Sequence, residues 1–430
     1  MSPWLLQKND IGRYPKLLVS HPRDMDTLRT LEPLHHICRV ANLWHWRLAP
    51  PPDADGLLLR RSRWLEAYGW SVFVAATCVA AYGLFVEGAE KDPDETTVTS
   101  IGHTVDFIQL VSMRVAHLAA LLEAVWQRKV QRELFAELGE IERLLAMELH
   151  ADVDGGRQGL RRQLGRQAVW LLWGYAVSQS LILVAKLLGP GHVFPVYWIY
   201  YLLPLLVCGL RYFQIFTAVQ TIRWHLDILL QALQQLQEKG VVVGDHGGSC
   251  MEAEDLAMKR LVAVRLIYQR VWALVSLVNR GYGISMLLLV GNDFLAITSN
   301  CYWIFLSFRQ SDASLGDILN ILASALWSAP HLGNVLILSL LCDRTTQCGT
   351  RLALGLHQVS VNLRNDVHNA LITQFSLQLL HQRLHFSASG FFNVDCTLLY
   401  TIVGATTTYL IILIQFHMSE GSEAGSGKHD

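Results

Sequence analysis

The sequence predicts an all-α protein that crosses a membrane seven times. Of its residues, 52% are hydrophobic, and the mean hydropathy is positive at +0.28. The apolar residues gather in runs of about twenty, the length of helix that spans a hydrocarbon core. Aromatic residues flank several runs, as they do at the two faces of a bilayer. These features disfavour a large helical protein without membrane spans, which needs neither such runs nor aromatic belts.

Seven runs satisfy these criteria, and each is expected to form one membrane-spanning helix. A polar and basic N-terminal segment, 1–66, precedes the first run. Trp64, Tyr68 and Trp70 form the aromatic belt where the first span begins. The predicted spans are 67–86, 101–125, 168–188, 197–219, 283–306, 318–341 and 398–416.

Lysine and arginine set the expected orientation of the chain. Most of the 35 Lys and Arg residues lie before the first span or in the segments that follow the second, fourth and sixth spans. The alternate segments hold only Lys91, Arg309 and Lys428. Basic loops stay in the cytoplasm. We therefore expect a cytoplasmic N-terminus and an extracellular C-terminus.

Two other classes of polytopic protein fit the sequence less well. A G-protein-coupled receptor has its N-terminus outside, and the chain has neither Asp-Arg-Tyr after the third span nor Asn-Pro-x-x-Tyr in the last. A secondary transporter often shows an internal repeat with interrupted helices in matching positions. The sequence has neither feature, so a transporter is the weaker alternative.

The cytoplasmic loops are expected to be helical, whereas the outer loops are short. Segments 126–167 and 220–282 carry helical patterning, and 342–397 is predicted to be a helical segment that leads to the last span. We interpret these segments as a helical cytoplasmic base. The outer loops leave no room for an extracellular domain, so a ligand must bind among the helices. The tail, 417–430, is expected to be disordered and extracellular.

The last span ends in a distinctive pattern. It reads Thr408-Tyr409, five aliphatic residues, then Gln415-Phe416. This stretch, TYLIILIQF, resembles the C-terminal signature of insect gustatory receptors without a departure from it. The preceding segment 385–395, HFSASGFFNVD, is similar to the same family, as are the chain length and the number of spans.

The resemblance implies a ligand-gated cation channel of four subunits, each with seven helices and a cytoplasmic N-terminus. It also implies that the cytoplasmic base makes most of the subunit contacts. Gly404, Thr408, Ile412 and Gln415 share one narrow face of the last span at helical spacing. In a homotetramer, the last spans would then surround a central pore.

The predicted pore-lining and gate residues are Gln415, Phe416, Ile412, Ile411 and Thr408. Four copies of Gln415 would form a ring of neutral amides, while Ile411 or Ile412 would form an apolar constriction. Tyr409 and Phe416 turn away from the narrowest face and are expected to pack against neighbouring subunits. The alternative is that Gln415 and Tyr409 only tie neighbouring helices together by hydrogen bonds.

The second span is the most polar, with two histidines, an aspartate and an arginine in one helical arc. A charged residue at membrane depth costs roughly 2.5 to 3.5 kcal/mol, so this arc must face protein or water. His103 and Asp106, in the outer third, are predicted ligand contacts. The alternative is an interhelical network in which Arg114 pairs with an acid such as Asp293. Glu123, near the inner surface, is expected to be solvated.

The outer half of the fifth span combines hydrogen-bonding groups with aromatic rings. Asp293, Asn300 and Trp303 lie there, and Trp327 of the sixth span is expected to complete a pocket with Asn320. Such a pocket suits a small polar or aromatic ligand. Membrane-belt anchoring is the alternative role for Trp303. The predicted ligand-binding set is His103, Asp106, Asp293, Asn300, Trp303 and Trp327.

These observations predict a plasma-membrane chemoreceptor that is itself a non-selective cation channel, opened in taste neurons by a small tastant. Its expected partners are the tastant, the lipid bilayer, permeating cations and identical or related subunits. No cofactor, metal, nucleic acid or enzymatic activity is expected. The alternative is a non-conducting co-receptor subunit. The family senses sugars, bitter compounds, carbon dioxide and internal metabolites, and the sequence does not choose among these ligands.

Overall fold

The computed structural model describes residues 34–49, 58–89, 100–151, 153–188, 202–243, 250–309, 315–359 and 366–426. Long helices account for most of this part of the chain, which confirms the all-α class. In chain order the elements are β1 (Trp46–Ala49), β2 (Leu58–Arg61), α2 (Arg63–Ala89), α3 (Ser100–Trp126), α4 (Arg128–Glu148), α5 (Val153–Leu188), α6 (Leu203–Val243), α7 (Cys250–Arg309), α8 (Leu315–His357), α9 (Asp366–His381), β3 (Ser387–Ala388), β4 (Phe392–Asn393) and α10 (Cys396–Ser426).

Six of the described helices are long and apolar enough to cross a membrane, namely α2, α3, α6, α7, α8 and α10. The remaining predicted span, 168–188, lies within the continuous helix α5. Each of the seven predicted spans therefore falls on a helix. The fourth span was expected to begin at 197, but α6 begins at Leu203, and residues 197–201 lie outside the described part of the chain.

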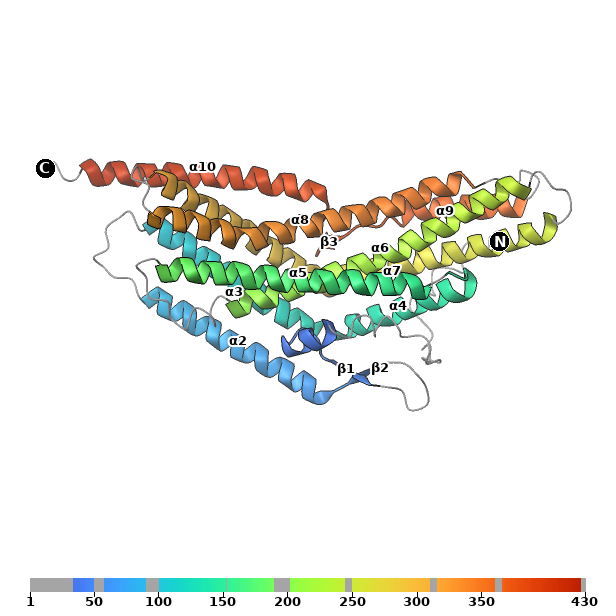
Figure 1. The fold of residues 1–430 in the computed structure, drawn as a ribbon, viewed down its shortest axis with the longest axis horizontal. Coiled ribbons are helices and arrows are strands. Elements are labelled where there is room, and N and C mark those ends of the chain that lie inside the picture. Colours follow the sequence, from blue (N-terminus) through green and yellow to red (C-terminus); the bar gives the residue numbers. More distant parts are fainter. Residues whose placement is uncertain are drawn as a thin grey trace, which may run out of the picture.

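Three helices are much longer than a membrane is thick. Helices α6, α7 and α8 have 41, 60 and 43 residues, which correspond to roughly 60, 90 and 65 Å at 1.5 Å per residue. They run together into one end of the molecule, on the right in Figure 1, where α4 and α9 join them. This end contains the segments that the sequence assigns to the cytoplasmic base.

The cytoplasmic base and the membrane bundle are not separate domains, because the same helices form both. The predicted fifth span, 283–306, is only the second half of α7. Helix α4 is amphipathic and packs its apolar residues, among them Leu138, Ile141 and Leu145, against the neighbouring helices. The base and the bundle thus share a single hydrophobic core.

The N-terminal segment forms part of this core. Residues 34–40 are helical, and β1 pairs with β2 in an antiparallel hairpin in which Trp46 lies opposite Arg61. Leu43, Trp44 and Trp46 are buried. Trp46 also donates a hydrogen bond from its indole Nε1 to the carbonyl oxygen of Arg128, at 3.0 Å. The segment therefore packs against the bundle where α3 passes into α4.

Helices α10 and α2 lie at opposite edges of the molecule, at the top and bottom of Figure 1. Asp395 caps α10 by accepting a hydrogen bond from the backbone N–H of Thr397 at 2.9 Å, a common N-terminal cap. The helix then continues to Ser426. The prediction of a disordered tail from 417 is therefore wrong for residues 417–426, because the last span simply extends; 427–430 lie outside the described residues.

Candidate functional site

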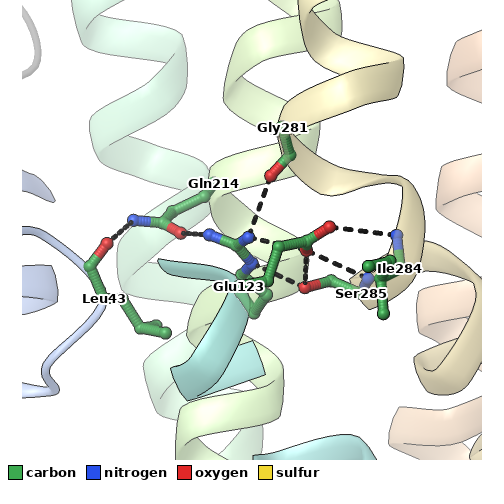
Figure 2. Close-up of polar contacts among 7 residues, drawn as sticks. Leu43, Glu123, Gln214, Gly281, Ile284 and Ser285 are labelled. Carbon is green, nitrogen blue, oxygen red and sulfur yellow. Dashed lines mark hydrogen bonds and ion pairs between the residues drawn. The ribbon is translucent and has the colours of Figure 1, made fainter. Parts of the chain in front are cut away.

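A charged cluster occupies the inner end of the bundle (Figure 2). Arg211 of α6 donates from Nη2 to Glu123 Oε2 of α3 at 2.8 Å, and from Nε to Ser285 Oγ of α7 at 2.9 Å. The side chains of Arg211 and Glu123 are 0% and 2% exposed. A buried ion pair requires close geometry and further hydrogen bonds to offset the loss of hydration. The cluster supplies both.

The remaining donors and acceptors of the cluster are also occupied. Arg211 Nη1 donates to the side-chain oxygen of Gln214 at 3.0 Å, and Gln214 donates in turn to the carbonyl oxygen of Leu43 at 3.2 Å. The guanidinium lies over the ring of Tyr282, 4.5 Å from its centroid, in a cation–π contact. The cluster thereby joins α3, α6, α7 and the N-terminal segment.

The cluster also takes over backbone hydrogen-bonding groups of α7. The backbone N–H groups of Ile284 and Ser285 donate to the two carboxylate oxygens of Glu123, each at 3.0 Å, and the hydroxyl of Ser285 also donates to Glu123. The carbonyl oxygen of Gly281 accepts from Arg211 at 3.2 Å (Figure 2). A side chain inserted into a helical hydrogen-bond ladder is a known cause of a local bend. Glu123 and Arg211 therefore fix the shape of α7 at this point.

The expectation that Glu123 is solvated is wrong. Its side chain is buried because Arg211, 88 positions further along the chain, neutralises it inside the bundle. The available signal was Arg211 itself, an arginine within an apolar run. Such a residue normally pairs with an acid, but the sequence does not show which one.

A short hairpin docks on the opposite face of α7. Strands β3 and β4 form this hairpin within the family-like segment 385–395. The side-chain amide of Asn279 binds the start of β3 through both its nitrogen and its oxygen. Its side-chain nitrogen donates to His385 O at 3.0 Å, and its oxygen accepts from Ser387 N at 3.1 Å. Gly283 approaches Ser389 so closely that an added Cβ would lie 3.1 Å from the backbone nitrogen of Ser389.

Helix α10 follows this hairpin directly. The stretch of α7 from 279 to 285 is consequently held by the charged cluster on one face and by the hairpin on the other. Hydrogen bonds hold the hairpin on α7, and β4 ends at Asn393, just before α10 begins at Cys396. A bend or straightening of α7 here is therefore expected to move the start of α10. This stretch, 279–285, is called the α7 junction below.

The two long faces of α10 differ in character. One face contacts its own bundle: Thr406 lies 3.4 Å from Thr298 of α7, and His417 lies 3.4 Å from the hydroxyl of Tyr302. Gln415, Thr408 and their neighbours are exposed. At 100° per residue the exposed face centred on Gln415 points away from the face centred on Thr406 and His417.

The predicted pore residues fall on this exposed side. Ile411 and Ile412 are 51% and 39% exposed, and Thr408, Gln415 and Phe416 are exposed as well. Thr408 uses its hydroxyl within the helix, donating to the carbonyl oxygen of Gly404 at 2.9 Å. Together these residues form an uncovered stripe with small and polar members.

Tyr409 has a contact within its own chain as well as an exposed side. Its ring makes an edge contact with Phe294 of α7, with centroids 5.9 Å apart, and its predicted contact with a neighbouring subunit stays a prediction. Half of the side chain remains exposed. Tyr409 therefore lies at the border between the bundle-facing and the exposed face of α10.

The structure brings together two of the predicted ligand contacts. Trp303 of α7 donates from its indole Nε1 to Asp106 Oδ1 of α3 at 2.8 Å. The same indole lies over Gly102, where an added Cβ would come within 2.9 Å of the ring. His103, on the same turn of α3, is exposed. Asp106, Trp303 and His103 are thus accessible near the end of the bundle that the distribution of basic residues predicts to be extracellular.

Asp293 lies in a different and fully buried place. Its carboxylate accepts hydrogen bonds from the hydroxyl of Tyr212 on α6 at 2.5 Å and from His331 Nδ1 on α8 at 2.7 Å. Arg114 of α3, its partner in the alternative interpretation, is also buried. The hydrogen bonds of Asp293 to Tyr212 and His331 form an interhelical network of the kind that this alternative expected. The partners of Asp293 were missed because neither Tyr212 nor His331 stands out within an apolar run.

The other predicted ligand contacts do not form one site with these residues. Asn300 is buried and donates to the carbonyl oxygen of Ala296 in its own helix at 2.6 Å. The ring of Trp327 lies 6.3 Å from that of His331, beside the Asp293 cluster. The predicted set is therefore divided between an accessible outer pair and a buried interhelical cluster.

These features define a class: a polytopic α-helical membrane protein whose spans extend into a helical base and whose last helix is uncovered. A family model described as "7tm Chemosensory receptor" matches residues 40–420. The chain is 69% identical over 420 residues to "Putative gustatory receptor 2a" of Drosophila melanogaster, which covers 93% of this chain and 98% of that protein.

Solved structures agree with the fold. The insect olfactory receptor OR5 from Machilis hrabei matches with a TM-score of 0.62 at 14% identity, covering 91% of this chain and 99% of that chain. The same receptor in complex with eugenol matches with a TM-score of 0.58. The chain belongs to the insect gustatory receptor family, as its C-terminal signature indicated. It is a chemoreceptor of the plasma membrane, and its family consists of receptors rather than enzymes.

Proposed function

We propose that this chemoreceptor is itself a ligand-gated cation channel in which four chains surround a pore lined by α10. The observation that carries the proposal is the direction of Gln415. It lies on the uncovered face of α10, opposite the residues that bind the helix to its own bundle. An uncovered amide on a membrane-spanning face is costly toward lipid but suits a water-filled conduit.

The chemistry of this face fits a channel of low selectivity. A ring of four Gln415 amides offers neutral oxygen atoms that replace part of the hydration shell of a cation without a fixed charge. The apolar side chains of Ile411 and Ile412 lie about one turn away, where a narrow apolar ring closes a pore by excluding water. Opening then requires only a small outward movement of α10.

Ligand contact is assigned to the outer pair, Asp106 and Trp303, with His103 beside it. The pair combines an aromatic platform with a carboxylate and remains accessible in the folded chain. A ligand that inserts between the indole and the carboxylate would separate α3 from α7. The buried Asp293 cluster is too enclosed by its own partners for direct contact and is assigned to interhelical packing.

The α7 junction provides a route from this pair to the pore. Helix α7 carries Trp303 at its outer end, holds the charged cluster further in, and contacts the hairpin that leads to α10. A ligand that prefers one arrangement of α3 and α7 shifts the population toward the corresponding position of α10. Gating therefore depends on α7, which the charged cluster and the hairpin hold at the α7 junction.

The test is a recording of ligand-evoked current from cells that express the chain alone. Gln415→Ala is expected to change the permeability ratio among cations, and Gln415→Glu to favour divalent cations, because it places four carboxylates in the pore. His417→Gln is the matched control, at the same height on α10 but facing the bundle, and is expected to leave permeability unchanged. Unaltered ion selectivity in both Gln415 variants would remove α10 from the pore.

The same recording tests the ligand contacts. Trp303→Phe keeps an aromatic ring but loses the hydrogen bond to Asp106 that an inserting ligand must break. It is therefore expected to raise ligand potency by about tenfold, in line with roughly 1.5 kcal/mol for a bond to a charged group. Maximal current should be unchanged. If the chain gives current only with a related subunit, the proposed homotetramer is wrong and the chain is a co-receptor.

A further inference from the structure

We propose that the inner half of α5 carries a binding site for an anionic phospholipid of the cytoplasmic leaflet. The site is a surface groove of about 590 Å³ lined by Arg162, Gly165, Arg166, Val169 and Trp170. Two guanidinium groups stand at its inner end and an indole at its outer end. This inference is independent of the pore.

The groove occupies a free face of an otherwise anchored helix. Leu160 and Leu164 are buried, and Arg157 donates to Glu142 of α4 at 3.1 Å, so one face of α5 is fixed to the bundle. At 100° per residue, Arg162 and Arg166 point in the opposite direction, and both are exposed. The helix backbone is thus held rigidly while the groove faces outward.

The charges of the groove lack a counter-ion within the described chain. The structure pairs Arg157 with Glu142, but it shows no acid paired with Arg162 or Arg166 among the residues it describes. Two like charges four residues apart on a helix repel each other. An anion between them removes that repulsion, and the forked guanidinium matches a phosphate in a bidentate manner.

The chemistry along the face matches a lipid from headgroup to acyl chain. Beyond the arginines come the exposed indoles of Trp170 and Trp173, 77% and 65% exposed, which suit the membrane interface. Further out, the same helix exposes the aliphatic side chains of Val177, Leu181 and Val184 near this angle. A free phosphate would contact only the arginines, whereas a phospholipid would contact the arginines with its headgroup and the indoles and aliphatic side chains with its acyl chains.

The position of the groove selects the leaflet. The arginines lie in the loop that follows the second span, which the distribution of basic residues places in the cytoplasm. The cytoplasmic leaflet carries the anionic lipids, and basic pockets on this side of membrane helices bind their headgroups. Gly165 contributes by leaving space, since an added Cβ there would meet nothing within 4 Å.

The experiment titrates the purified full-length receptor in detergent with phosphatidylserine or phosphatidylcholine and counts retained lipids by native mass spectrometry. We expect preferential retention of phosphatidylserine. The double variant Arg162→Gln with Arg166→Gln should weaken it by at least about fivefold, since one basic residue near an anionic surface contributes about that factor. The double variant Arg162→Lys with Arg166→Lys keeps the charge but loses the fork, and should be intermediate.

The matched control is the double variant Arg351→Gln with Lys259→Gln, which removes the same charge from two exposed positions of the base. It should retain phosphatidylserine as the unaltered receptor does. Equal retention in all variants overturns the proposal. So does full displacement of the lipid by inorganic phosphate, or a change of oligomeric state without loss of lipid, which would identify the face as a subunit contact.

Discussion

The charged cluster and helix α10 are two opposite solutions for polar groups inside a membrane protein. In the cluster, the charges of Glu123 and Arg211 are fully enclosed, and partners within the same chain satisfy them. On α10, Gln415 and Thr408 remain uncovered at the edge of the molecule. Polar groups satisfied within one chain stabilise its fold, whereas polar groups left uncovered on a span require something outside the chain.

This contrast predicts that substitutions in the cluster act on stability and substitutions on α10 act on function. The strongest test is Glu123→Ala. It leaves Arg211 buried without its carboxylate and removes the acceptor of two α7 backbone N–H groups, so we expect a loss of about 3 to 5 kcal/mol. The measurement is thermal unfolding in detergent, with surface expression alongside.

Glu133→Ala is the control for Glu123→Ala, because Glu133 is an exposed glutamate on α4. It should unfold like the unaltered receptor. Replacing both partners, Glu123→Gln with Arg211→Gln, should recover part of the stability, because no uncompensated charge then remains buried. If Glu123→Ala unfolds at the same temperature as the unaltered receptor, the Glu123–Arg211 pair does not stabilise the bundle, and the prediction is wrong.

A second buried group should give the receptor a pH-dependent stability. Burial lowers the pKa of His45 from 6.5 to about 4. Its Nε2 lies 3.0 Å from Asn42 Oδ1, beside the N-terminal residues that the cluster holds. Between these two pH values the unfolded chain takes up a proton that the native chain excludes, so stability is complete above about pH 6.5 and falls as the pH drops.

The expected loss between pH 7 and pH 5 is about 2 kcal/mol, from roughly 1.4 kcal/mol per pH unit. His45→Gln should flatten the dependence of the melting temperature on pH over this range. His36→Gln, an exposed histidine of the same segment, is the control and should leave the dependence intact. An unchanged slope in His45→Gln would contradict burial of the neutral imidazole.

The α7 junction lies between the two extremes, since it links the cluster to α10. Gly283→Ala introduces a Cβ within 2.9 Å of the Ser389 hydroxyl and 3.1 Å of its backbone nitrogen. Overpacking of this kind costs about 1 to 3 kcal/mol, and displacement of the hairpin should shift the ligand concentration for half-maximal current. Gly291→Ala, on the same helix with open space around it, has the same gain in helix propensity, roughly 0.5 to 1 kcal/mol, without the close contact. It should therefore not lower stability and should leave potency unchanged.

The smallest effect on stability is expected for Gln415→Ala. Because Gln415 is exposed in the folded chain, its truncation should change the melting temperature of the subunit by less than the equivalent of about 0.5 kcal/mol. This result, combined with altered permeation, would complete the contrast with Glu123. A large loss of stability would instead indicate that Gln415 ties helices together.

The periodicity of the sequence predicted much of what is local. It placed the spans on helices, identified α4 as amphipathic, and put Thr408 and Gln415 on one face of α10, because side chains at helical spacing share a direction whatever surrounds them. For α7 it placed helix in both the base segment and the span, but it did not show that the two form one helix of 60 residues.

The candidate site was only partly predictable for the same reason. Trp303 and Asp106 were both named, yet their contact joins residues 197 positions apart and leaves no trace in either segment. The pairs Glu123 with Arg211 and Asp293 with His331 span 88 and 38 positions. The chain contains many other acidic and basic residues, so the sequence could not show which of them pairs with each buried charge.

By itself, the sequence determined that this protein is a helical membrane receptor and which of its loops carry the basic residues. The motif in the last span also determined its family. These properties depend on hydropathy, charge and spacing within single segments. Only the tertiary structure decided which buried charges meet, that α7 carries both the cluster and the hairpin, and that Gln415 faces away from its own bundle. Those properties arise from packing between segments that are distant in the sequence. Many pairings of residues are compatible with the same pattern of hydrophobic and charged residues, and only the packing of the helices decides which pairing forms.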